Sequence, residues 1–88
     1  MPLEIIYLPR FIKKYRKLPK NLREEVREKI ELFSKKPRHP FLKTHKLSGA
    51  LKGRWSFSVN YEYRVVFRYL SKEKVVLLCV GNHDVYKI

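Results

Sequence analysis

Residues 63–80 read YRVVFRYLSKEKVVLLCV and carry two strand patterns in succession. In the first, Tyr63 to Leu70, Val65, Phe67 and Tyr69 alternate with Arg64, Val66 and Arg68, which indicates a strand with one buried face. In the second, Lys74 to Val80, apolar residues occupy both faces, as in a central strand of a sheet. Ser71-Lys72-Glu73 supplies the turn between these two strands.

Upstream of this pair, residues 55–61 alternate between two kinds of side chain. Trp55, Phe57, Val59 and Tyr61 take turns with small polar residues, so the pattern predicts a third strand with one buried and one polar face. Thr44 to Leu47 is a candidate for a short fourth strand.

The first forty residues predict a strand and two helices. Leu3 to Leu8 is a short apolar segment closed by Pro9, and a helix with a basic outer face follows. Asn21 and Glu24 resemble a capping box at the start of a second helix that runs to about Lys36. The apolar positions that define the two helices are Phe11, Ile12, Tyr15 and Leu18, then Leu22, Val26, Ile30 and Phe33.

These elements predict an α+β fold over residues 1–88, as a single domain. Its order is an N-terminal strand, an antiparallel helical hairpin, and a three- to four-stranded, mainly antiparallel twisted sheet. Because the connection between the helices is short, the two helices are expected to pack antiparallel as a hairpin.

The net positive charge of the chain indicates a polyanionic partner. Lys and Arg number 21 against 8 Asp and Glu, a formal net charge of +13, and no acidic residue lies between Glu31 and Glu62. A concentrated positive field favours a phosphate polymer, because each neutralised phosphate releases counterions. A solvated basic surface, or charge enrichment in a heat-adapted protein, is the alternative.

The single cysteine and the lack of long apolar segments narrow the class of protein. The single Cys79 lies in an apolar run and is expected in the core, so neither a disulfide nor a multi-cysteine zinc site is available. We expect no metal and no cofactor. The sequence shows no signal peptide and no apolar stretch near twenty residues, so we expect a cytoplasmic protein without a membrane partner.

Several polar residues have the types needed to cleave RNA without a metal. His45 stands in the acid-free stretch, Arg64 lies on a strand, and His83 follows Gly81 and Asn82 after the central strand. Such cleavage needs a base for the ribose 2′-hydroxyl, a guanidinium for the phosphorane, and an acid for the leaving 5′-oxygen. Each of these residues also has an interpretation as a structural residue without a catalytic role.

In those ordinary interpretations, His83 caps the strand or lies on the surface. Arg64 pairs with Glu62 or Asp84. Trp55 anchors the core in preference to stacking on a base, because Phe57 and Val59 share its face.

The sequence resembles the RelE/ParE superfamily of small bacterial and archaeal toxins, and most closely its YoeB and YafQ branches. The resemblance covers nearly the whole chain. The segments that carry it are Lys17–Pro19, His45–Gly49, Gly53–Ser56, Glu62–Phe67 and Gly81–Tyr86.

This resemblance implies the toxin of a type II toxin-antitoxin system. It implies an endoribonuclease that cuts mRNA in the ribosomal A site, leaves a 2′,3′-cyclic phosphate, and is neutralised by an antitoxin. We expect a monomer alone and a hetero-oligomer with the antitoxin. Alternatives are a ParE-like inhibitor of DNA gyrase with the same fold, and a non-catalytic basic nucleic-acid-binding module.

The resemblance also assigns roles. Arg64 matches the arginine that stabilises the transition state, His83 matches the general acid, and His45 is the candidate base with Lys46 as its electrostatic neighbour. YoeB carries a glutamate where this chain reads Phe41-Leu42-Lys43. The chain therefore departs from the YoeB pattern at the general base. The expected substrate-binding residues are Lys46, Lys52, Arg54, Arg68 and Tyr86, which lies one residue short of the terminal aromatic of YafQ.

Overall fold

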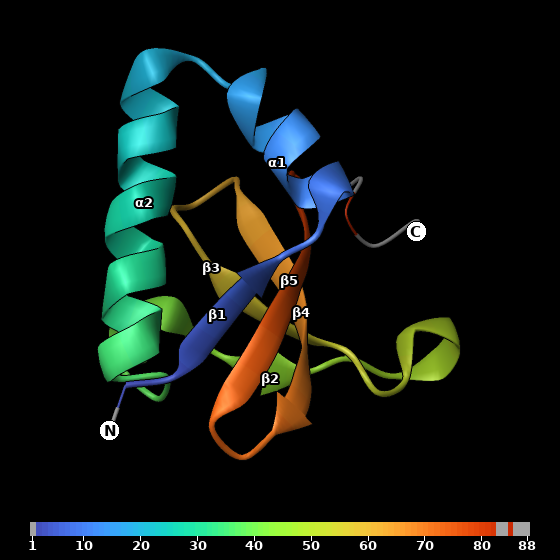
Figure 1. Ribbon diagram of the computed structural model, residues 1–88. Helices are drawn as coiled ribbons and strands as arrows, with labels where there is room; N and C mark the ends of the chain where they lie inside the picture. Colours follow the sequence, from blue (N-terminus) through green and yellow to red (C-terminus); the bar gives the residue numbers. More distant parts are fainter. Residues whose placement is uncertain (1, 83–84, 86–88) are drawn as a thin grey trace.

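The computed structural model describes residues 2–82 and residue 85, and its main feature is a five-stranded mixed sheet with a helical hairpin (Figure 1). The strands lie in the order β1-β5-β4-β3-β2. β1 runs parallel to β5, and the remaining neighbours are antiparallel. The elements are β1 (Glu4–Tyr7), α1 (Pro9–Arg16), α2 (Lys20–Lys35), η1 (Pro40–Leu42), β2 (His45–Lys46), η2 (Gly49–Leu51), β3 (Trp55–Ser58), β4 (Arg64–Ser71) and β5 (Lys74–Gly81).

The predicted α+β order is confirmed, including the short strand β2. Strand β5 lies between β1 and β4, and Val75 to Val80 are all buried, as predicted for a central strand. In the part of the chain that the structure describes, no helix is long and apolar enough to cross a membrane.

The predicted capping box is wrong. Helix α2 begins at Lys20, directly after Pro19, and no side chain caps it. The amide of Arg23 donates to the carbonyl of Pro19 at 2.9 Å, so Asn21 already lies inside the first turn. Pro19, with a φ of −56°, occupies the N-cap position that the pattern assigned to Asn21.

The main core fills the space between the sheet and the two helices. Phe11 of α1 and Phe33 of α2 belong to one buried cluster with the sheet residues Phe57 and Phe67. The ring of Phe33 lies 4.5 Å from that of Phe57 and 4.6 Å from that of Phe67, measured between centroids. Both helices therefore bury their apolar stripes against the same face of the sheet.

The sheet face opposite the helices, which we call the helix-free face, carries a second, smaller cluster. Val66, Val76, Leu78, Cys79 and Val85 form its buried part, so Cys79 lies in an apolar core as predicted. Its strand positions are set by the register, which pairs Ser56 with Val66 and Val66 with Cys79.

Strand β3 differs from its prediction, because it has no solvent-facing polar side. Ser56 is 0% exposed and Ser58 is also buried, since the second cluster covers the helix-free face around them. The strand ends at Ser58, and Tyr61 is 96% exposed instead of continuing the buried alternation.

A β-bulge in β5 sets which residues reach the helix-free face. Phe67 pairs with Leu77 and Val66 pairs with Cys79, so Leu78 is the extra residue on β5. Beyond the bulge the alternation is shifted by one residue. Val80 consequently joins the main core, and Gly81 comes opposite Arg64.

Candidate active site

Strand register brings three predicted site residues to the helix-free face. His45 pairs with Ser56 across β2 and β3, and Arg64 pairs with Ser58 across β3 and β4. Arg68 lies four residues further along β4, on the same face as Arg64. His45, Arg64 and Arg68 therefore share one surface of the sheet.

The imidazole of His45 is held in a defined orientation. Its Nδ1 lies 2.8 Å from the carbonyl oxygen of Lys43, and the side chain is exposed. Because a carbonyl only accepts hydrogen bonds, Nδ1 carries the hydrogen in the neutral ring, and Nε2 is left with its lone pair. Nε2 is therefore the ring nitrogen that can accept a proton.

The guanidinium of Arg64 is anchored to the turn that precedes its own strand. Its Nη1 donates to the carbonyl oxygen of Asn60 at 3.0 Å and to that of Tyr63 at 3.4 Å. The Oδ1 of Asn60 in turn accepts from the amides of Glu62 at 2.9 Å and Tyr63 at 2.8 Å. Asn60 therefore builds the turn that positions Arg64.

The alternative interpretation of Arg64 as the partner of Glu62 is wrong for this structure. Among residues 2–82 and 85, ion pairs join Lys35 to Glu31 and Lys74 to Glu4. Arg64 instead uses backbone carbonyls, and a guanidinium with five N–H donors keeps others for a ligand. Asp84 lies outside the described residues.

His45 and Arg64 stand apart on the helix-free face, with the buried residues Ser56 and Ser58 of β3 between them. They lie two strands apart and two residues out of register, which corresponds to about 12 Å between their Cα atoms on a regular sheet. The imidazole contacts the carbonyl of Lys43, and the guanidinium contacts the turn before β4.

A hollow beside Arg64 has aromatic residues at its rim that the sequence patterns did not single out. Its volume is about 450 Å³, and Lys43, Ser58 and Arg64 line it together with Asn60. Phe41 is 71% exposed and Tyr61 is 96% exposed, and both also line this hollow. Exposed aromatic rings beside cations are suited to stacking on unpaired bases. Tyr61 was not predicted to be a surface residue, because it continues the alternation of Trp55, Phe57 and Val59 and was therefore assigned to the buried face.

Lys46 lies on the other side of the sheet from His45. Its Nζ is 5.5 Å from the ring centroid of Trp55, its partner in register, and Arg38 lies over the same ring at 5.7 Å. Trp55 packs against the main core, as the core-anchor interpretation predicts. Lys46 therefore does not flank the imidazole of His45, although it lines a hollow of about 540 Å³ with Lys52 and Arg54.

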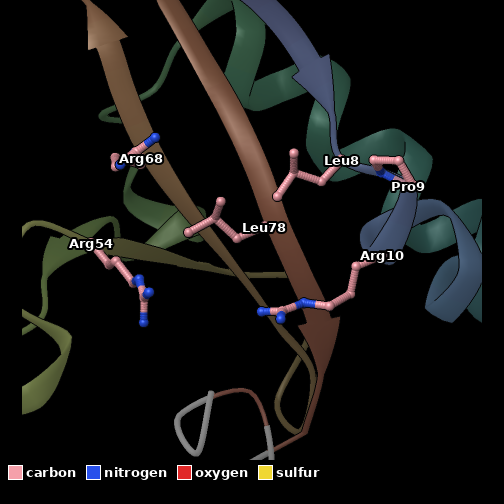
Figure 2. A pocket seen from close by; sticks show the side chains of 6 residues that line it. All are labelled: Leu8, Pro9, Arg10, Arg54, Arg68 and Leu78. Carbon is pink, nitrogen blue, oxygen red and sulfur yellow. The ribbon is translucent and has the colours of Figure 1, made fainter.

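Arg54 and Arg68 line a different pocket together with Arg10, which the sequence patterns did not identify. This pocket has a volume of about 500 Å³, and its other walls are Leu8, Pro9 and Leu78 (Figure 2). It lies at the end of the helix-free face away from Arg64. Arg10 comes from the first turn of α1, so its position there becomes visible only in the folded chain.

The predicted acid His83 and the predicted aromatic Tyr86 lie outside the described residues. The strand that leads to them ends at Gly81, directly opposite Arg64. A Cβ built on Gly81 would lie 3.1 Å from Cγ1 of Val85 and 3.5 Å from Nζ of Lys14. The backbone is therefore tightly packed where β5 ends, and Lys14 of α1 adds a positive charge there.

In the described part of the chain, no group of three His, Cys, Asp or Glu side chains is arranged to hold a metal ion.

The five-stranded mixed sheet with its helical hairpin is a RelE-like α+β fold. Residues 5–85 match the family model described as the ParE toxin of type II toxin-antitoxin systems, parDE, and the chain belongs to this family. The predicted membership of the RelE/ParE superfamily is thereby confirmed. No curated protein sequence matches the chain.

Solved structures support the same fold. The toxin-antitoxin complex RelBE2 from Mycobacterium tuberculosis contains a chain with 22% identity and a TM-score of 0.79, with 94% of this chain and 100% of that chain covered. YafQ from E. coli has 17% identity and a TM-score of 0.77, covering 96% and 97% of the two chains. The YoeB dimer from Staphylococcus aureus has 20% identity and a TM-score of 0.73, covering 94% and 99%. At these identities the likeness concerns the fold.

Proposed function

We propose that this toxin is a ribosome-dependent mRNA endoribonuclease that works without a metal. The observation that carries the proposal is that His45, oriented by the carbonyl of Lys43, and Arg64, anchored to Asn60, share the helix-free face. A base and a fixed cation on one surface are two of the three groups that cleavage through the 2′-hydroxyl requires.

In the proposed reaction, Nε2 of His45 takes the proton of the ribose 2′-hydroxyl. The 2′-oxygen then attacks the adjacent phosphorus, the bond from phosphorus to the 5′-oxygen breaks, and a 2′,3′-cyclic phosphate remains. Arg64 stabilises the charge that develops on the phosphorane oxygens. His83 is the sequence-based candidate for protonating the leaving 5′-oxygen.

The ribosome supplies the geometry that a free transcript lacks. In-line attack needs the 2′-oxygen, the phosphorus and the 5′-oxygen to be aligned, and an mRNA held in the A site has its backbone constrained. The excess of positive charge gives affinity for the RNA backbone that does not depend on sequence. This proposal places the protein in the cytoplasm.

An antitoxin is the second proposed partner. Solved relatives include the RelBE2 toxin-antitoxin complex and a heterotetrameric YoeB-YefM complex from Staphylococcus aureus. We infer that this toxin is monomeric alone and forms a hetero-oligomer with an acidic antitoxin that covers the basic face. Such a partner would also relieve the self-repulsion of thirteen excess charges.

Inhibition of DNA gyrase is the second candidate function, and the matched family model, named for ParE, favours it. That activity would act by protein contact and needs neither His45 nor Arg64 as a chemical group.

Mapping of RNA ends separates the two candidates. Purified toxin and programmed ribosomes are expected to yield A-site fragments that end in a 2′,3′-cyclic phosphate. After a chelation step with EDTA, magnesium is restored only as far as ribosome integrity requires, and cleavage is expected to persist. Intact mRNA in this assay, together with inhibited supercoiling by gyrase, would replace the proposal with the second candidate.

A further inference from the structure

We propose that Arg10, Arg54 and Arg68 form a pocket for the phosphate of a nucleotide other than the one that is cleaved. The three arginines come from separate elements: the first turn of α1, the residue before β3, and β4. Figure 2 shows the guanidinium groups of Arg10 and Arg54 pointing toward each other across an open space, with Leu78 at the side of that space.

Among the described residues, the charged side chains that line this pocket are all arginines. If the pairing of Trp55 with Phe67 is extended by one residue, Arg54 of the segment before β3 comes opposite Arg68 of β4. Arg10 stands in the first turn of α1, where the helix dipole is positive and no acidic residue offsets it. Among the described residues, neither Asp nor Glu lines the pocket. An anion that entered the pocket would meet guanidinium groups from three separate elements.

The shape of the pocket favours a nucleotide over a bare ion. Its volume of about 500 Å³ exceeds what a single phosphate occupies, and Leu8, Pro9 and Leu78 form an apolar wall. Guanidinium groups bind phosphate oxygens through paired N–H donors. An apolar wall next to them offers a surface for a ribose or a base.

The pocket is too far from Arg64 to hold the scissile phosphate. Arg64 and Arg68 are four residues apart on β4, which corresponds to about 13 Å. Neither His45 nor Arg64 lines the pocket. The identification of its occupant as a nucleotide of the bound mRNA rests on the proposed function, whereas phosphate binding itself does not.

Titration of the full chain with three probes tests the proposal. Adenosine 5′-monophosphate, inorganic phosphate and adenosine are added in turn, and the arginine Nε–H signals are followed by NMR. We expect the monophosphate to bind more tightly than inorganic phosphate and adenosine to produce no saturable shift. Arg10→Gln and Arg68→Gln should each weaken binding of the monophosphate by about tenfold, the loss of one charge-assisted contact.

Arg16→Gln is the matched control, because it removes the same charge from the other end of α1. We expect it to change the affinity by about twofold or less, as a distant, screened charge does. Equal losses in Arg10→Gln and Arg16→Gln would show only diffuse attraction and overturn the pocket. Equal affinity for inorganic phosphate and the monophosphate would overturn the nucleotide assignment.

Two further outcomes are distinguishable. Binding of an Asp- and Glu-rich peptide in the absence of any response to the monophosphate would overturn the proposal and assign the pocket to a protein partner. Arginine-dependent binding of the monophosphate by a toxin that leaves ribosomal mRNA intact would support the pocket while the proposed function fails.

Discussion

The Nδ1 atom of His45 lies 2.8 Å from the carbonyl oxygen of Lys43, and this contact sets the tautomer of the candidate base. Lys43 has a left-handed backbone with φ of 49°, which aims its carbonyl toward the ring two residues later. The contact uses only main-chain atoms of Lys43. Backbone conformation at residue 43, and not the identity of its side chain, therefore orients His45.

Lys43→Asn should preserve or slightly increase the free energy of unfolding, by up to about 1 kcal/mol, because asparagine tolerates the left-handed region better than lysine. Urea denaturation measures this change. Lys36→Asn is a control, since Lys36 is exposed and its φ is −140°. A loss well above 1 kcal/mol for Lys43→Asn would contradict the strained-backbone account.

Asn60→Ala should lower the free energy of unfolding by about 1–3 kcal/mol, because the amides of Glu62 and Tyr63 lose their shared acceptor. It should also slow cleavage, since the turn that anchors Arg64 loosens. Urea denaturation and single-turnover cleavage measure the two effects.

The matched control keeps the acceptor oxygen. Asn60→Asp combined with Glu25→Gln retains Oδ1 and removes the repulsion that a new carboxylate would meet at Glu25. This double variant should remain within about 1 kcal/mol of the parent. A cleavage rate for Asn60→Ala equal to that of the parent would show that the turn does not position Arg64.

Local pattern was sufficient for most of the fold. Helical spacing in residues 11–33 and alternation in residues 63–70 reflect burial against one face, and such periods are readable without tertiary information. The bulge at Leu78 could not be predicted from the sequence. The strand is apolar on both faces, so it shows no alternation of polar and apolar residues that a bulge would interrupt. Burial of Ser56 was equally hidden, since it depends on a second cluster built by distant strands.

The candidate site was predictable in residue type but not in geometry. His45 and Arg64 were identifiable as chemical groups, yet the carbonyls that hold them belong to turns whose conformation emerges only on folding. The face of Lys46 could have been predicted, because adjacent strand residues point to opposite sides of a sheet. Arg10 carried no local signal, because its role depends on where α1 meets β5.

Stability at alkaline pH should report on Tyr7. Burial, and secondly the nearby Tyr15, raise the pKa of Tyr7 above 10.0. The folded state therefore keeps this proton longer than the unfolded state, so its contribution is complete below about pH 10 and is lost as the pH rises through the folded pKa. Between about pH 9 and pH 11 the parent should lose more stability than Tyr7→Phe. Parallel pH curves for the two proteins would refute this.

Binding of an antitoxin should weaken as salt increases, because the proposed contact joins carboxylates to the basic helix-free face. Isothermal titration calorimetry at low and high ionic strength measures the change. An affinity that stays constant with salt would instead indicate docking in the apolar groove between α1 and α2, lined by Tyr7, Phe11, Ile12, Tyr15 and Ile30 with Arg16 and Arg27.

The most direct test of the account is the single-turnover rate of mRNA cleavage on programmed ribosomes, measured at saturating toxin. Arg64→Ala should lower this rate by about 10² to 10³-fold, the usual effect of losing one preorganised charge donor. His45→Ala should lower it by about 10² to 10⁴-fold, the range for a general base. Lys72→Gln, in the exposed turn between β4 and β5, should leave the bound-state rate unchanged. Parental rates in both Arg64→Ala and His45→Ala would contradict the central claim that this face of the sheet performs the chemistry.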